Sequence, residues 1–90
     1  MNNFVYIETI AKKDYEYSLI ESNILFENTG ETKVYGIEIS GNNEYSIAED
    51  ISTEKDDVSK LLELVAEEEL FPVHLLEFIE DFLSCPNDYI

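Results

Sequence analysis

The chain has 90 residues, and its 21 Asp and Glu residues stand against five Lys and no Arg, which gives a formal net charge of −16 at pH 7. Because 44% of the residues are hydrophobic, the chain has enough apolar side chains to fold around a core, unlike an acidic disordered segment. So negative a surface repels nucleic-acid phosphates and anionic membranes, which excludes direct binding to either and favours basic proteins or cations as partners.

The length is that of one domain, so we expect residues 1–90 to form a single domain with one core. Cys85 is the only cysteine and cannot close a disulfide within the chain. The sequence shows neither a signal-peptide pattern nor an apolar run of about 18 residues. These features predict a soluble protein of the reducing cytoplasm.

Apolar and polar side chains alternate at the start of the chain, as they do in half-buried strands. The alternation predicts a first strand over Phe4–Ile10, in which Phe4, Tyr6 and Ile10 share one face. The polar residues at 12–14 then form a turn.

A second strand is predicted over 14–22, because its apolar side chains again fall on alternate positions, at Tyr15, Tyr17 and Leu19. We expect this strand to continue through 24–26 after an irregularity at Ser22-Asn23. Asn28-Thr29-Gly30 is a turn signal, since Gly accepts a positive φ without a Cβ clash.

The third and fourth strands are predicted over 32–40 and 45–48, joined by a turn at Gly41-Asn42-Asn43. Gly36 lies inside the third strand, where a glycine marks a bulge or a close packing contact. Four strands joined by short turns indicate an antiparallel meander.

The hydrophobic period changes at Ser52, where the sequence predicts the start of a helix over 53–69. Ser52 or Thr53 would be the N-cap, with Asp56 in the capping-box position. The helix would bury one stripe at i, i+3, i+4 and i+7 spacing, formed by Val58, Leu61, Leu62 and Val65.

A second helix is predicted over 72–84, because Pro72 disfavours helix in the residue before it yet suits a first helical turn. Its buried stripe would consist of Leu75, Ile79, Phe82 and Leu83. Cys85-Pro86-Asn87 would end it.

The predicted fold class is therefore α+β: an antiparallel sheet of about four strands over about 3–51, with two antiparallel helices, over 53–69 and 72–84, packed on one face. The other face, or an edge strand such as Phe4–Ile10, would be solvated or used for association, including as a homodimer.

Catalytic and metal-binding residues are scarce. His74 and Cys85 are too far apart along a helix to form a nucleophilic pair, and His74, Glu77 and Asp81 share a helical face but are too few for a metal site. The three glycines do not form a phosphate-binding loop. We therefore expect no enzyme, no cofactor and no metal.

The acidic residues gather in the second half: residues 44–90 carry a net charge of −12, against −4 for residues 1–43. Rows of carboxylates about 6 Å apart along two helices could imitate the phosphates of a nucleic acid. The contacts expected first are Glu63, Glu67, Glu77, Glu80 and Asp81. The hypothesis is a non-enzymatic acidic protein that inhibits or regulates a basic, nucleic-acid-handling protein by occupying its nucleic-acid site.

The alternative is a housekeeping protein–protein interaction module that uses its sheet face or edge, with the acidity serving solubility. The tyrosines on the predicted strands fit this alternative as well as core packing. Base stacking by these rings is disfavoured, because few basic residues accompany them.

Several short segments resemble a family of short uncharacterised proteins from clostridia and related Firmicutes. They are Tyr35-Gly36-Ile37, Glu49-Asp50-Ile51-Ser52-Thr53, Pro72-Val73-His74-Leu75 and Ile79-Glu80-Asp81-Phe82-Leu83. The resemblance implies the strand, the helix-opening turn and the Pro-initiated last helix, and a bacterial or phage origin. It implies no activity, and it leaves room for a phage-encoded inhibitor of a host defence protein, such as an anti-CRISPR.

Overall fold

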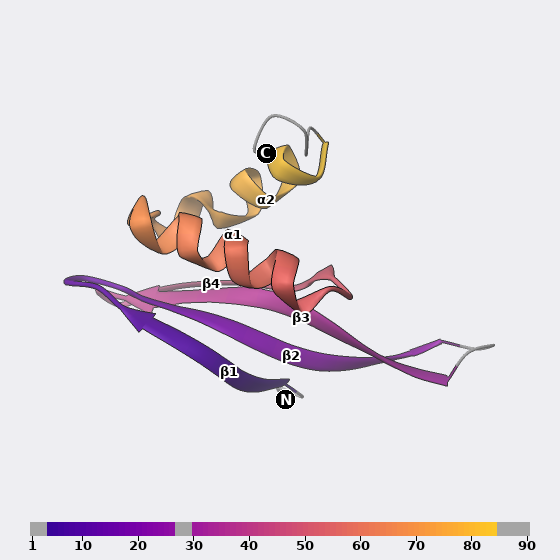
Figure 1. Cartoon of the computed structure of the whole chain (residues 1–90). Helices are drawn as coiled ribbons and strands as arrows, with labels where there is room; N and C mark the ends of the chain where they lie inside the picture. Colours follow the sequence, from indigo (N-terminus) through magenta and orange to yellow (C-terminus); the bar gives the residue numbers. More distant parts are fainter. Residues whose placement is uncertain (1–3, 27–29, 85–90) are drawn as a thin grey trace.

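The computed structural model describes residues 4–26 and 30–84. Four strands form one antiparallel sheet in the order β1-β2-β3-β4, and both helices lie on one face of it (Figure 1). The elements are β1 (Phe4–Ala11), β2 (Glu16–Phe26), β3 (Gly30–Gly41), β4 (Glu44–Ser52), α1 (Lys55–Glu67), a 3-10 turn (Pro72–His74) and α2 (Leu75–Ser84). The predicted α+β fold, a meander followed by two helices, is confirmed.

The central pair, β2 and β3, forms a long hairpin. Its register runs without a shift from Glu16 opposite Ser40 to Phe26 opposite Gly30, so the irregularity predicted at Ser22-Asn23 is wrong. The pairing holds because side chains keep alternating there: Ser22 is buried and Asn23 is exposed. β1 and β4 pair only with the half of this hairpin that is away from its turn. The half next to the turn therefore extends as a two-stranded arm (Figure 1).

The turn signals at the two ends of β3 have different outcomes. Asn42 and Asn43 have φ values of 50° and 63°, the left-handed pair typical of a two-residue hairpin turn, so the turn predicted there is confirmed. In the other turn, Gly30 has φ of 77°, while Asn28 and Thr29 lie outside the described residues.

A bulge in β1 changes which face its side chains use. Tyr6 pairs with Ile20 and Glu8 with Leu19, so Ile7 is the extra residue. Phe4 and Tyr6 therefore face away from the helices, while Ile10 packs against the core beneath them. The prediction that Phe4, Tyr6 and Ile10 share one face is wrong, because a bulge shifts the alternation by one residue.

A larger irregularity lies between β3 and β4. Tyr35 pairs with Ser52 but Ile37 pairs with Ala48, so Gly36 faces three residues of β4. A Cβ on Gly36 would overlap the carbonyl oxygen of Ala48, which confirms both the predicted bulge and the close contact. Strand β4 is longer than the predicted 45–48 because pairing resumes after the bulge.

Helix α1 begins later than predicted. Its N-cap is Glu54, without a side-chain capping bond, so the assignment of Ser52 or Thr53 as N-cap is wrong. Ser52 still belongs to β4, and its hydroxyl accepts a 3.0 Å hydrogen bond from the Glu54 N–H. The helix ends at Glu67, before Glu69 at φ of 50°, and therefore spans 55–67 instead of 53–69.

The second helical segment begins with the 3-10 turn at Pro72 and continues as α2, which runs back in the general direction opposite to α1 (Figure 1). The core lies between this helical layer and the sheet. The stripe predicted for α1 is buried, as are Leu75 and Ile79 of α2, while Phe82 is half-buried. These side chains pack on Tyr17, Leu19, Ile37 and Ile39. The predicted contact of Leu83 and the helix end at Cys85-Pro86-Asn87 lie outside the described side chains.

None of the helices in the described part of the chain is both long enough and apolar enough to cross a membrane.

Candidate functional site

The carboxylates predicted as the binding site lie in the helical layer, and all five are exposed: Glu63, Glu67, Glu77, Glu80 and Asp81. Glu63 and Glu67 lie one turn apart on α1, on the side opposite to its buried stripe. The other three lie on α2. Because each helix is packed on the sheet through buried residues, the carboxylates project from a fixed scaffold.

These charges have few cationic neighbours. The salt bridge that the described residues contain within the sheet joins Lys33 Nζ to Glu21 Oε2 at 3.7 Å. On the helical layer, neither Lys55 nor Lys60 comes within 4.0 Å of a carboxylate of the described chain. Lys55 and Lys60 therefore do not cancel the negative field of the helices through ion pairs with the described residues.

A shallow depression of about 580 Å³ lies along α2 and gathers part of the predicted site. It is lined by Leu70, His74, Glu77, Phe78, Glu80 and Asp81. The structure thus brings the three α2 carboxylates together around a partly aromatic floor, whereas Glu63 and Glu67 lie on α1 outside it. Within residues 4–26 and 30–84, no group of three His, Cys, Asp or Glu side chains is placed to hold a metal ion.

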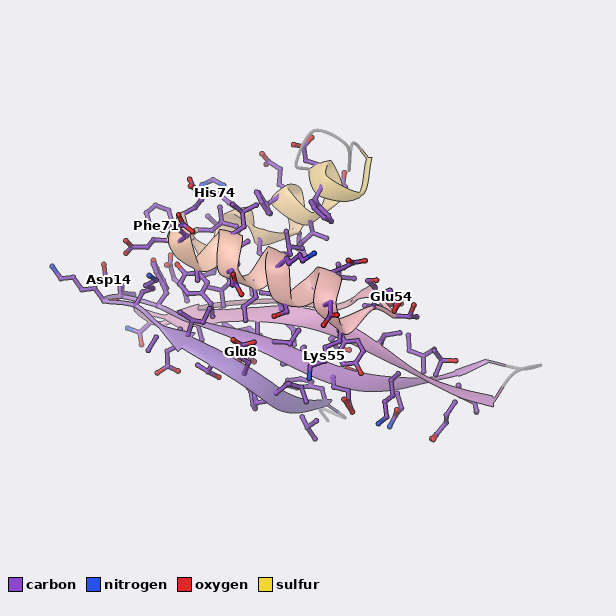
Figure 2. The ribbon with its side chains drawn as sticks, viewed as in Figure 1. Glu8, Asp14, Glu54, Lys55, Phe71 and His74 are labelled. Carbon is purple, nitrogen blue, oxygen red and sulfur yellow. The ribbon has the colours of Figure 1, made fainter. Side chains whose placement is uncertain are left out.

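The helical layer also exposes three large apolar side chains that the sequence reasoning missed. Phe71, Val73 and Leu76 are 54%, 75% and 57% exposed. Figure 2 shows Phe71 and His74 together at one end of the layer. Their rings are stacked, with 6.2 Å between the ring centroids. The signal was present in the sequence, because Phe71, Val73 and the Leu75-Leu76 pair supply more apolar residues than one buried stripe can hold.

The sheet face away from the helices carries a second cluster, which the sequence did not predict. Glu38 is only 6% exposed, and the Tyr6 hydroxyl donates to its carboxylate, at 2.9 Å from each oxygen. This hydrogen bond, with some burial, raises the pKa of Tyr6. Burial and the neighbouring Glu38 carboxylate raise the pKa of Tyr45. The two tyrosines belong to the two edge strands, so their approach to Glu38 depends on the register of the whole sheet.

The fold and these surfaces define a small α+β protein with an acidic helical layer on one side of the sheet and an aromatic cluster on the other. The chain matches the model of the Family of unknown function (DUF6514) over residues 3–85 and therefore belongs to that family. The predicted membership of an uncharacterised family is thus confirmed. No curated protein and no solved structure matches the chain.

Proposed function

We propose that the protein is a non-enzymatic acidic binding protein, and that its helical layer occupies the nucleic-acid site of a basic partner protein. The observation that supports this best is the set of exposed carboxylates on two packed helices, of which Glu63, Glu67, Glu77 and Glu80 make no ion pair with a described residue. A partner rich in Lys and Arg would supply the missing counter-charges.

Binding would depend on both charge and rigidity. Carboxylates one helical turn apart lie about 6 Å apart along the axis, and their positions are set before the partner arrives. The net charge of −16 attracts a cationic surface from a distance, which speeds association and makes the affinity fall with salt. Because the helices are already packed, binding would have to order little more than the carboxylate side chains, and the entropy cost of binding would be small.

The exposed apolar residues beside the carboxylates favour a protein as the partner. A surface needed only for solubility would have no use for Phe71, Val73 and Leu76 next to Glu77 and Glu80. Binding surfaces combine a few apolar anchors with a polar rim, and charges alone rarely supply the affinity.

The protein would act in the cytoplasm of a bacterium related to the clostridia. A copy carried by a phage would inhibit a nucleic-acid-binding defence protein of its host.

The experiment compares two charge-reversal variants with the same net charge. One variant changes the five helical residues Glu63, Glu67, Glu77, Glu80 and Asp81 to Lys. The matched control changes five exposed acidic residues of the sheet to Lys: Glu8, Glu16, Glu31, Glu49 and Asp50. Each reversal removes two negative charges, so five reversals bring both variants from −16 to −6.

Proteins captured from a bacterial lysate at low salt are tested for release of labelled DNA or RNA by the wild-type protein. We expect the wild-type and the control variant to displace the nucleic acid, and the helical variant to fail. If both variants lose displacement equally, overall charge and not the helical layer is responsible. If no captured protein binds nucleic acid, the proposed function is wrong.

A further inference from the structure

The sheet face away from the helices contains one buried carboxylate, Glu38. The surroundings of Glu38 are much less charged than the helical layer. The positions directly beside Glu38 are Ser18 and Ile47, opposite it in β2 and β4, and Gly36 and Ser40, two residues away along β3. All four are uncharged, and Ser18 and Gly36 are buried. A buried carboxylate in such surroundings needs donors or cations, since a charge without partners is costly to desolvate.

The partners that the structure provides are tyrosine hydroxyls, of which Tyr6 lies closest to both carboxylate oxygens and Tyr45 also interacts with Glu38. Tyr6 reaches Glu38 from one edge strand and leaves its ring 57% exposed, with Phe4 packed edge-on against it at 5.5 Å between ring centres. Each tyrosine hydroxyl supplies one proton without neutralising the carboxylate, and a carboxylate can accept about four hydrogen bonds. The charge of Glu38 therefore remains available to a cation that approaches this face.

Tyr45 lies on the same face in the other edge strand, two residues from Ile47, which pairs with Glu38, and 56% of its side chain is exposed. Burial, a hydrogen bond to Glu38 and the charges of Glu38 and Glu49 all raise the pKa of its hydroxyl. Two half-exposed tyrosine rings thus lie beside a buried negative charge. Aromatic faces attract cations through the ring quadrupole, and a carboxylate behind them adds to that attraction.

We propose that this Tyr6–Glu38–Tyr45 cluster binds an arginine side chain of a protein partner. A guanidinium is planar, stacks on aromatic faces and is more weakly hydrated than an ammonium, so it fits two tyrosine rings beside a carboxylate better than lysine does. The occupant is not a second copy of this chain, because the chain contains no arginine. Two copies meeting through this face would also bring two Glu38 carboxylates together.

The inference goes beyond the proposed function, because the cluster and the helical carboxylates lie on opposite faces of the sheet (Figure 1). A partner that covers the helical layer leaves the cluster accessible. The two binding surfaces can therefore be tested separately, with variants that affect one and not the other.

The probe is the blocked tripeptide Gly-Arg-Gly, titrated into the isotope-labelled protein and followed by NMR. The control peptide contains citrulline, which has nearly the shape of arginine but no charge. We expect the arginine peptide to shift the ring signals of Tyr6 and Tyr45 and the amides around Glu38. The citrulline peptide should bind at least about ten-fold more weakly, because it lacks the cation. Equal binding of both peptides, or shifts confined to the helical carboxylates, would overturn the proposal.

Glu38→Gln tests the carboxylate while keeping an acceptor for the Tyr6 hydroxyl, so the fold should be retained, as circular dichroism would verify. We expect arginine-peptide binding to weaken by about ten-fold. Tyr45→Leu removes one ring and its hydroxyl while leaving the Tyr6 hydrogen bond to Glu38, and it should weaken binding as well. Unchanged binding in both variants contradicts the proposal.

The variant in which the five helical carboxylates are changed to Lys should still bind the arginine peptide, with shifts at the same tyrosines as in the wild type. That result stands whether or not the helical layer displaces nucleic acid. Size-exclusion chromatography tests the other possible occupant of this face, a second copy of the chain. A wild-type dimer that Tyr45→Leu converts to a monomer would show that a second copy covers this face, and the proposal would be wrong.

Discussion

Three tyrosine hydroxyls each donate to a defined acceptor, and two of these acceptors are carboxylates. Tyr6 donates to Glu38, Tyr15 to Glu44 at 2.5 Å, and Tyr17 to the backbone carbonyl of Leu70 at 3.0 Å. In a chain with only five lysines, tyrosine supplies the donors that lysine or arginine would supply elsewhere. A hydroxyl holds a carboxylate in place without neutralising it, so the local structure is fixed while the negative charge is kept.

Tyr17 connects the sheet to the start of the second helical segment. Its side chain is fully buried in the core, and burial, together with the charge of Glu69, raises its pKa to about 12. A raised pKa means that the folded state holds the hydroxyl proton more tightly than the unfolded chain does. The stability that this proton supports is present below pH 10 and is lost as the pH rises towards 12.

Tyr17→Phe should therefore change both the size and the pH dependence of stability. At pH 8 we expect the free energy of unfolding to fall by about 1 kcal/mol, because the Leu70 carbonyl loses its donor. Between pH 10 and 12 the wild type should lose about 2 kcal/mol more than the variant. Urea unfolding followed by circular dichroism over this pH range measures both. Curves that run parallel above pH 10 would show that Tyr17 does not titrate with the fold.

At the scale of elements, the pairing of β3 with β4 depends on one residue without a side chain. Gly36 faces the three residues of the β4 bulge, and the backbone there lies against it: besides the overlap with Ala48, a Cβ would come within 2.6 Å of the Glu49 carbonyl oxygen. The bulge in turn directs Ile51 into the core. The end of β4 and the start of α1 thus depend on this contact.

Gly36→Ala should destabilise the protein by about 2 to 3 kcal/mol, because a rigid backbone must move to admit the methyl group. Gly30→Ala is the matched control. Its φ of 77° makes alanine strained by about 1 kcal/mol, but a Cβ there meets nothing within 4 Å. Urea unfolding of both variants gives the comparison. If Gly36→Ala lowers the free energy of unfolding no more than Gly30→Ala does, the β4 backbone moves easily to admit the methyl group.

The elements themselves could be predicted from the sequence, because their buried residues follow simple periods. The alternation of Tyr15, Tyr17 and Leu19 and the helical spacing from Val58 to Val65 each place a stripe in the core. The predictions that were wrong concern features that are set by contacts between elements. The bulge at Ile7 is set by pairing with β2, and the late start of α1 is set by Ser52 remaining paired with Tyr35. No local pattern in the sequence contains this information.

For the whole molecule, one of the two proposed binding surfaces could be predicted from a local pattern in the sequence and the other could not. Helical periodicity is enough to predict that Glu63, Glu67 and the α2 carboxylates are exposed, and they are. The Tyr6–Glu38–Tyr45 cluster joins residues of three strands and requires both the meander and the β1 bulge, so it is visible only in the folded sheet. The fold thus separates an acidic layer from an aromatic face, with the shared core between the helices and the sheet.

The net charge of −16 opposes this fold, because exposed carboxylates repel one another and few of them are paired. Added salt screens this repulsion, so raising KCl from about 0.05 to about 0.5 M should increase the free energy of unfolding by about 1 kcal/mol or more. Urea is the suitable denaturant, since guanidinium is itself a salt. The five-fold helical reversal variant, at −6, should show a much smaller increase. If salt stabilises both proteins equally, or destabilises the wild type, the carboxylates of the helical layer are not held close enough to repel one another, and they would not form the fixed array that the proposed function requires.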